Sequence, residues 1–247
     1  MNFFPLTAFL RVFILFIFPI PVYAQPSPLP SAQEGYTFSY SILEVEQGNI
    51  ELLESARNDL LTEASSNGGV VYATWVSADK PLDAPFAGLS NNQMGLMLAW
   101  SNDSLGQAET FRAALESIDR VTMVSSRLFE AVYLPAGLEL PTEDGFYVHR
   151  EEKYSLEDVS DAVRLSQEAW VTWEPHWGVV VVGLFREIDS TTEVVNLNRI
   201  VWYPSYEAWL ETRNFAEDME SAARFRERRS MLIPGSGIAI ATDWLEP

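Results

Sequence analysis

The chain contains no cysteine and only two histidines among its 247 residues. The absence of cysteine excludes disulfides, thiolate metal sites, iron–sulfur clusters, cysteine nucleophiles and a lipidated cysteine. The histidines form neither a His-x-x-x-His nor a His-Glu-x-x-His spacing, so we expect no metal site. Basic residues are also scarce, with 16 Lys and Arg against 35 Asp and Glu and a formal net charge of −19. Such a charge is repelled by nucleic acid and by anionic membranes, so neither is an expected partner.

Residues 1–24 lack the length of apolar sequence that a membrane span needs. They carry one charge, Arg11, an apolar run of about 9 to 12 residues against the roughly 20 that cross a bilayer, and small residues up to Ala24. This arrangement is typical of a secretory signal peptide. We therefore expect cleavage after Ala24 and export to the periplasm or the medium, with an uncleaved anchor as the alternative. Residues 25–34 are expected to form a proline-rich leader.

The remaining sequence contains the same order of predicted elements twice. Each copy reads strand, helix, strand, strand, helix, strand, with residues 135–144 as the linker between a unit at 35–135 and a unit at 145–247. The matched segments are 35–42 with 145–150, 49–61 with 155–173, 69–76 with 178–185, 94–101 with 196–203, 106–120 with 206–229, and 127–134 with 238–244. The third strands are aligned on Trp100 and Trp202. The first copy has a longer loop, 77–92, before its third strand.

This element order is that of the ferredoxin-like split βαβ unit. Its sheet carries both helices on one face, so the other face needs a cover. Two tandem units cover each other when their open faces pack together around a barrel-like interior. The expected fold is therefore α+β: two tandem ferredoxin-like units packed sheet to sheet as an intramolecular dimeric α/β barrel. Pairing of the open face with another chain is the alternative, and the sequence leaves monomer and homo-oligomer open.

The second unit also resembles the NIPSNAP branch of the dimeric α/β-barrel superfamily. The resemblance rests on the opening strand YVHREEKY at 147–154, the apolar strand after Trp177, and NRIVWYPSYEAW at 198–209. The first unit looks like a degenerate partner copy. The resemblance implies the barrel fold, and the usual members of the family are binding or scaffolding proteins. Related barrels include cofactor-free monooxygenases, haem-binding enzymes and small cyclases, so the resemblance implies no catalytic signature.

The two histidines are the candidate catalytic residues, because histidine alone has an unperturbed pKa near neutrality. His149 lies on the first strand of the second unit, and His176 lies between the first helix of that unit and its second strand. A structural or surface role is the alternative for His149, and packing within a loop is the alternative for His176.

Arg199 is the first candidate ligand-binding residue. It lies in the middle of a predicted strand, where a buried guanidinium needs a partner. Either Glu151 or Glu152 pairs with it, or it binds an anionic ligand. Strand alternation places the neighbouring Asn198 on one face with Trp202. On the first strand of the unit, His149 shares a face with Tyr147, and Arg150 shares the other with Val148 and Glu152; either face could point into the barrel. Asn198, Trp202 and Tyr147 are the further candidate ligand-binding residues.

The predicted helix at 206–229 carries acids early and four arginines late: Arg224, Arg226, Arg228 and Arg229. This distribution complements the helix dipole and predicts a stabilised helix. Given the acidic background, the arginines do not indicate a nucleic-acid site.

Three functions remain. The favoured one is an exported protein whose barrel binds a small apolar or aromatic molecule without catalysis, since aromatic residues are abundant and catalytic motifs are lacking. The second is a cofactor-independent oxygenase or cyclase that uses a histidine base, and the third is a structural interaction protein with a filled barrel. No cofactor is expected. A pocket with His149 or Arg199 in its wall would favour the first two, and a filled interior would favour the third.

Overall fold

The computed structural model describes residues 35–45, 50–81, 83–115, 121–135, 144–188, 193–214 and 216–244. The predicted signal peptide (1–24) and leader (25–34) lie outside these ranges, as does most of the linker. Within the described part of the chain, no helix is long and apolar enough to cross a membrane.

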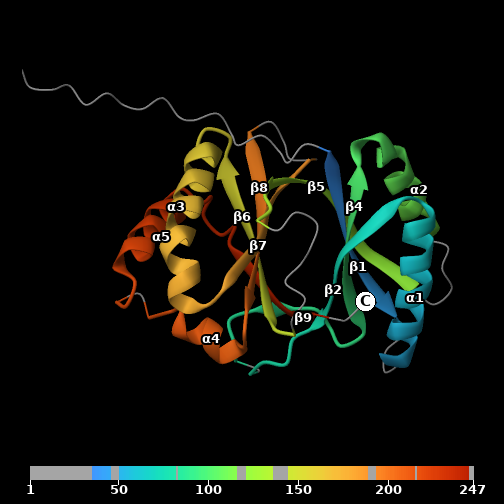
Figure 1. The fold of residues 1–247 in the computed structure, drawn as a ribbon, viewed down its shortest axis with the longest axis horizontal. Helices are drawn as coiled ribbons and strands as arrows, with labels where there is room; N and C mark the ends of the chain where they lie inside the picture. The colour runs from blue at the N-terminus through green and yellow to red at the C-terminus, as the bar shows by residue number, and fades with distance from the viewer. Residues whose placement is uncertain are drawn as a thin grey trace, which may run out of the picture.

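The first half follows the predicted order of elements (Figure 1). Its strands and helices are β1 (Tyr36–Val45), α1 (Ile50–Ser66), β2 (Gly69–Ser77), the two-residue β3 (Ala87–Gly88), β4 (Gln93–Ser101), the short 3-10 helix η1 (Asn102–Ser104), α2 (Leu105–Leu115) and β5 (Val121–Tyr133). Strand β3 has no counterpart in the second half and arises from the longer loop of the first copy.

The second half repeats the order with one difference. Its elements are β6 (Phe146–Ser155), α3 (Val159–Trp177), β7 (Val180–Glu187), β8 (Val194–Tyr203), α4 (Tyr206–Glu211), α5 (Met219–Ser230) and β9 (Ile238–Trp244). The single helix predicted at 206–229 is wrong, because α4 and α5 are separate helices. Each has its own cap: the Ser205 hydroxyl accepts from the Ala208 amide at 3.2 Å, and the Asp218 carboxylate accepts from the Ser221 amide at 3.2 Å.

Helix α3 extends four residues beyond its predicted end and includes His176 in its last turn. The helix ends at Gly178, which has a φ of 62° and donates its amide to the Glu174 carbonyl. Glycine accepts this left-handed conformation at no steric cost, so Gly178 is the stop signal. The prediction that His176 lies in a loop between helix and strand is therefore wrong.

The strands form one sheet that closes on itself. The order is β2-β4-β1-β5-β7-β8-β6-β9-β3, and β2 also pairs with β9. Two antiparallel seams join the halves: Phe129–Tyr133 of β5 along β7, and Trp75–Ser77 of β2 along β9. The predicted intramolecular dimeric α/β barrel is confirmed, and backbone hydrogen bonds at both seams satisfy the sheet edges that an open sheet would leave unpaired.

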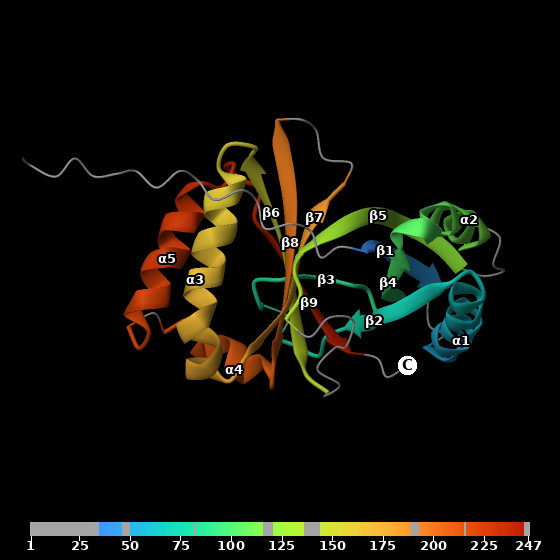
Figure 2. The ribbon, with the colours of Figure 1, turned by 45° about the horizontal axis from the view of Figure 1, so that its top comes forward.

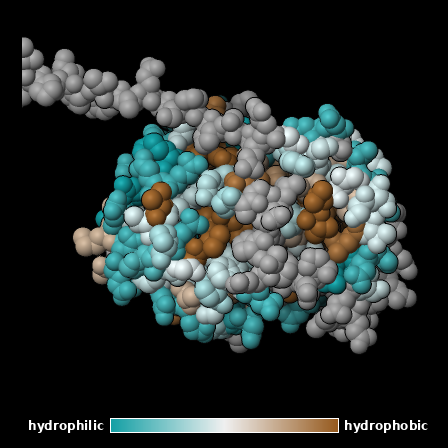
Figure 3. Space-filling view, in the orientation of Figure 1, coloured by the Kyte–Doolittle hydropathy of each residue, from teal (hydrophilic) through white to brown (hydrophobic). Residues whose placement is uncertain are grey.

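The closed sheet separates three hydrophobic cores. One fills the barrel interior, one lies between the sheet and α1 and α2, and one lies between the sheet and α3 and α5. Both views show the helices on the outside, with α1 and α2 on one flank and α3 and α5 on the other (Figure 2). The flank over α3 and α5 is largely hydrophilic on the side drawn in Figure 3, as expected for an acidic, solvated surface.

The extended loop of the first half binds the second half. Phe86 packs against Trp209 with ring centroids 4.5 Å apart and against Phe146 at 5.6 Å. The next two residues form β3, which pairs in parallel with β9. The loop therefore joins the halves in addition to the two seams.

A β-bulge lies at the same place in the second strand of each half, between Val71 and Ala73 and between Val181 and Gly183. The two bulges meet inside the barrel, where the Tyr72 hydroxyl donates to the Val182 carbonyl at 3.1 Å. This buried hydrogen bond joins the halves at their centre.

We predict that Tyr72→Phe lowers the free energy of unfolding by about 1 kcal/mol, because the Val182 carbonyl loses its side-chain donor while the ring packing remains. The expected fall in melting temperature is about 2–4 °C. Tyr36→Phe is the control, since Tyr36 is 38% exposed. Equal melting curves for wild type and Tyr72→Phe would contradict the prediction.

Candidate functional site

The barrel interior is filled by side chains. Its buried members are Phe38, Tyr40, Tyr72, Ala73, Trp75, Met97, Ala99, Phe129, Ala131, Leu134, Tyr147, Val182, Phe185 and Ile200. Tyr147, a predicted ligand-binding residue, lies in this core with none of its surface exposed, and Asn198, which is 2% exposed, lies on the inward face of β8 next to Ile200. Trp202, on the same face, packs against the same core.

His149 lies deep in this interior. Its ring stacks on Tyr40 at 5.7 Å, meets Trp75 edge-on at 4.5 Å, and its Nε2 lies 3.0 Å from the Thr242 hydroxyl. Burial, followed by the positive charge of Arg127, lowers the pKa of His149 from 6.5 to about 3. The imidazole is therefore neutral near pH 7 and enclosed by aromatic rings.

His176 is exposed in the last turn of α3, with its ring 4.7 Å from that of Trp177. Neither histidine lines a pocket that the structure describes.

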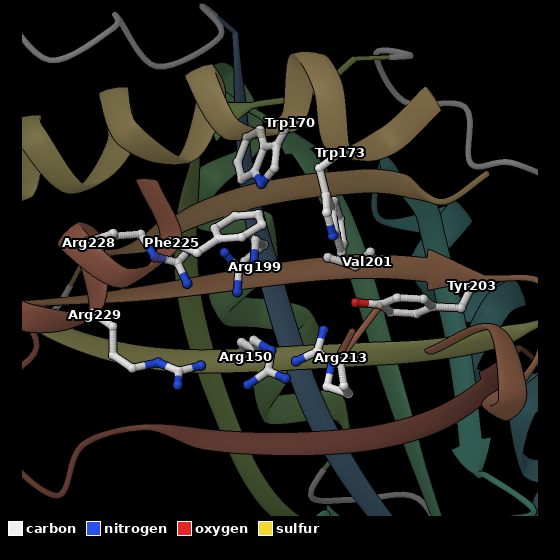
Figure 4. A pocket seen from close by; sticks show the side chains of 10 residues that line it. All are labelled: Arg150, Trp170, Trp173, Arg199, Val201, Tyr203, Arg213, Phe225, Arg228 and Arg229. Atoms are coloured by element: carbon white, nitrogen blue, oxygen red, sulfur yellow. The ribbon is translucent and has the colours of Figure 1, made fainter. Parts of the chain in front are cut away.

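A pocket lies on the opposite face of the sheet, between β6 and β8 and helices α3 and α5 (Figure 4). It is lined by Arg150, Trp170, Trp173, Arg199, Val201, Tyr203, Arg213, Phe225, Arg228 and Arg229. The space free of atoms is about 450 Å³, part of it open to solvent, and only about 40 Å³ is wide enough for the centre of a water molecule. The pocket is therefore a narrow slot with aromatic walls.

Five arginines from three parts of the fold meet at this slot. Arg150 lies on β6 and Arg199 on β8, Arg213 follows α4, and Arg228 and Arg229 end α5. Arg150 and Arg199 are direct partners across the antiparallel ladder. Like charges directly opposite each other destabilise a sheet, so the ladder itself brings unfavourable charge to this point.

Glu152 is the carboxylate that contacts Arg199 and Arg228. Its Oε1 accepts from Arg228 at 3.2 Å and lies 3.8 Å from Arg199, and its Oε2 accepts from the Tyr154 hydroxyl at 3.0 Å. Arg228 also donates to the Ser166 hydroxyl at 3.2 Å. Glu152 therefore holds two of the five guanidinium groups, both more than nine-tenths buried.

Several donors at the slot have no acceptor. Nε and Nη1 of Arg199 and Nε of Arg228 are buried without a hydrogen-bond partner. Burial lowers the pKa of Arg150, as does the charge of Arg213, and burial likewise lowers the pKa of Arg213. Burial raises the pKa of Tyr203, which keeps its hydroxyl protonated. The site is thus positive, partly desolvated and rich in donors, which suits an anion.

The predicted site residues are divided between two faces of the sheet. Arg199 lines the slot, with Glu152 as the nearby carboxylate, whereas Asn198, Trp202 and Tyr147 face the barrel interior. The structure thus does not bring Arg199 together with the other three. This division follows from the alternation of side chains along β8, because residues 198 and 199 point to opposite faces of the sheet.

Arg150, Arg213, Arg228 and Arg229 were not predicted to be site residues. For Arg150 a signal existed, because it shares a strand face with Val148 and Glu152. The late arginines of α5 were interpreted as dipole partners, and Arg228 instead points into the core, 5% exposed.

Haem, which the related barrels named above imply, does not fit the residues at this slot. Iron in haem proteins takes a histidine, cysteine, methionine or tyrosine ligand. The slot contains no residue of the first three types, and Tyr203, its one phenol, has a raised pKa that disfavours the phenolate an iron would bind. No group of three or more metal-binding side chains occurs in the described ranges.

Comparison with known proteins finds the fold but no family. No protein-family profile matches the chain, and no curated protein matches its sequence. An anthrone oxidase-like protein of known structure has a TM-score of 0.52 and 13% identity over 88% of this chain and 94% of its own. A chlorite dismutase mutant from Candidatus Nitrospira defluvii has a TM-score of 0.51 and 11% identity over 85% of this chain and 91% of its own. A protein from Lactobacillus acidophilus, provisionally named a monooxygenase, has a TM-score of 0.50 and 10% identity over 86% of this chain and 94% of its own.

These neighbours are dimeric α/β barrels, and the chain has their fold. Most are enzymes by name. This finding contradicts the favoured expectation of a barrel that binds a small molecule without catalysis. The filled interior leaves no space there for that molecule and by itself favours the structural alternative. The position of Arg199 in the wall of the slot is the observation that favours a ligand site.

We predict that buried His149 makes stability depend on pH. The unfolded chain binds the proton with a pKa of about 6.5 and the folded chain with a pKa of about 3, so the unfolded state holds more protons between these values. The contribution of neutral His149 to the free energy of unfolding is therefore fully present above about pH 6.5 and falls as the pH drops. Between about pH 7.5 and about pH 5 the loss from this group is about 2 kcal/mol.

Urea unfolding measures this loss. His149→Phe keeps the ring packing and is expected to lose about 2 kcal/mol less than wild type over the same pH range. His176→Gln, which changes an exposed residue, is expected to follow wild type. If the free energy of unfolding depended on pH equally in wild type and His149→Phe, the pH dependence could not be assigned to buried His149.

We also predict that Glu152→Gln lowers the free energy of unfolding by about 3 kcal/mol, because two buried guanidinium groups lose their one carboxylate partner. Glu168→Gln is the matched control. Glu168 also contacts two arginines, Arg164 and Arg224, but is 42% exposed, so we expect a loss below about 1 kcal/mol. Chemical denaturation compares the two variants, and equal losses would contradict the central place of Glu152.

Proposed function

We propose that the protein is a cofactor-independent enzyme of the oxygenase or cyclase type, and that the arginine slot binds an aromatic substrate and stabilises its anion. The observation that carries this proposal is the convergence of five arginines and one glutamate on an aromatic-walled slot, in a chain whose net charge is −19. A solvated acidic surface gives no reason for this local excess of positive charge.

The physical argument is electrostatic. Donors and charges that are already oriented around a partly desolvated site stabilise negative charge that develops in a reaction. A phenol or an enolisable ring ketone bound here ionises more readily, because guanidinium groups favour its anion. Such an electron-rich anion is the reactive form for cyclisation or for attack by molecular oxygen. Trp170 and Trp173 supply flat apolar walls for the ring.

The roles of the residues follow from their positions. Arg199 and Arg150 hold the anion from the sheet, while the protonated Tyr203 hydroxyl donates to it from the same sheet face. The expected histidine base has no place in this scheme, since His149 is enclosed in the barrel and His176 lies at the outer end of α3. The substrate proton passes to water at the open side of the slot.

The names of two structural neighbours support an oxygenase over a cyclase. One is an anthrone oxidase-like protein and the other a provisional monooxygenase. Both likenesses are below 15% identity and concern the fold, so the reaction type remains part of the proposal.

Within the superfamily, we propose a place near the NIPSNAP branch on the segments at 147–154 and 198–209. These segments lie on β6 and along the run from β8 into α4, and their strand residues Arg150, Arg199, Val201 and Tyr203 line the slot. Export is likewise a proposal that rests on residues 1–24. Mass spectrometry of the mature N-terminus tests it, with Gln25 as the expected first residue.

The test of the proposed function is the ionisation of a bound phenol. We expect the pKa of para-nitrophenol, followed by the absorbance of its anion, to fall by about one unit on binding, which corresponds to about 1.4 kcal/mol of preference for the anion. Arg150→Gln is expected to halve the shift. Arg164→Gln, on the outer surface of α3 and paired with Asp161 and Glu168, is the control and is expected to leave it unchanged. A bound pKa equal to or above the free value would overturn the proposal.

A further inference from the structure

The most deeply buried part of the slot combines N–H donors with little space, and we propose that it binds one small monovalent anion, such as chloride, nitrate or formate. The donors belong to Arg199 of β8, Arg228 of α5 and Trp170 of α3, and we call them the inner donors. This anion is a second ligand, additional to the aromatic substrate of the proposed function, and its site does not depend on that substrate.

The inner donors lack acceptors. Nε and Nη1 of Arg199, Nε of Arg228 and Nε1 of Trp170 are buried and have no hydrogen-bond partner among the described residues. All three side chains are more than nine-tenths buried. In Figure 4 the indole nitrogen of Trp170 points into the slot, toward Arg199. A buried donor without an acceptor is costly, so a ligand that accepts hydrogen bonds from several of these groups is favoured.

The charge around the inner donors selects an anion over a neutral acceptor. Arg199 and Arg228 both contact Oε1 of Glu152, at 3.8 and 3.2 Å, while Oε2 of Glu152 accepts from Tyr154. Arg150 lies directly opposite Arg199 on the ladder. Burial lowers the pKa of Arg150, and the charge of Arg228 adds to this effect, which shows that these cations lie close together. Three guanidinium groups therefore act on the single carboxylate of Glu152 at this point of the described structure.

The size of the space limits the anion. About 40 Å³ of the slot is wide enough for the centre of a water molecule. One bound water needs roughly 10–15 Å³ of such space, so a halide or a small planar oxyanion enters the slot as it stands. A larger ligand enters only when the aromatic walls move apart. The rings of Trp170, Trp173 and Phe225 also keep bulk water away, which strengthens the attraction between the arginines and an anion.

The experiment compares sodium chloride with sodium gluconate at equal concentration and neutral pH. Both salts screen the acidic surface equally, but gluconate is too large for the inner end of the slot. Because the anion binds the folded state, we expect chloride to raise the melting temperature above its value in gluconate. The expected difference is about 4 °C when chloride is present at about ten times its dissociation constant. Equal melting temperatures in the two salts would leave water as the occupant and overturn the inference.

Two conservative variants remove inner donors while the charge and the aromatic wall remain. Arg199→Lys keeps a positive charge beside Glu152 and removes Nε and Nη1, and Trp170→Phe keeps a ring and removes Nε1. Each is expected to weaken chloride binding about tenfold in a calorimetric titration. Arg164→Lys, on the outer surface of α3 and paired with Asp161 and Glu168, is the control and is expected to bind chloride as wild type does.

Equal chloride affinity in wild type and in both variants would indicate an adventitious ion only and would overturn the assignment to the slot. If Arg199→Lys does not fold, Trp170→Phe still decides the question, because Nε1 of Trp170 has no described hydrogen bond to lose. Crystals grown with sodium bromide locate the ion by its anomalous scattering. We expect bromide within hydrogen-bonding distance of the inner donors, and bromide bound only elsewhere would contradict the site.

The outcomes separate this inference from the proposed function. If chloride binds at the inner donors while bound para-nitrophenol keeps its ordinary pKa, the anion site stands and the catalytic proposal is wrong. If bound para-nitrophenol ionises more readily but the melting temperature is equal in chloride and gluconate, the proposed function stands and the small anion is wrong.

Discussion

Closure of the barrel is the constraint on which the other features depend. The seams between β5 and β7 and between β2 and β9 join the sheet of the first half to that of the second. The inner faces of both halves therefore form one enclosed core. Such a core needs large apolar side chains, and rings such as Phe38, Trp75 and Phe185 supply them. A ligand site is therefore displaced to the outer faces, where helices and sheet leave space between them.

The two outer faces differ, which explains why the slot occurs in one half. In the first half, β4 presents Leu96, Leu98 and Trp100 to the helices, and Trp100 packs on Phe111 with centroids 5.5 Å apart. In the second half, β8 presents Arg199, Val201 and Tyr203. The same architecture thus holds a solid core under α1 and α2 and a charged slot under α3 and α5.

The sequence was sufficient to predict the fold because the signals are local and occur twice. Alternating strands, helical spacing and turn residues gave the element order, and the open sheet face then required a cover. The register was not predictable to one residue. Trp100 and Trp202 align in sequence, yet Trp100 lies under the helices and Trp202 packs against the barrel core. A slip of one residue exchanges the faces, and no local propensity reports it.

The site was harder to predict because its members are distant in sequence and share no spacing. Arg150 and Arg199 become neighbours only through the ladder between β6 and β8, and Arg228 joins them only because α5 packs on α3 beside Glu152. Such a cluster holds unfavourable electrostatic energy, since two like charges face each other and several buried donors have no acceptor. The rest of the fold must compensate for that energy. Under the proposed function, a bound anion lowers it, so the charge cluster that destabilises the free protein is the same feature that favours binding.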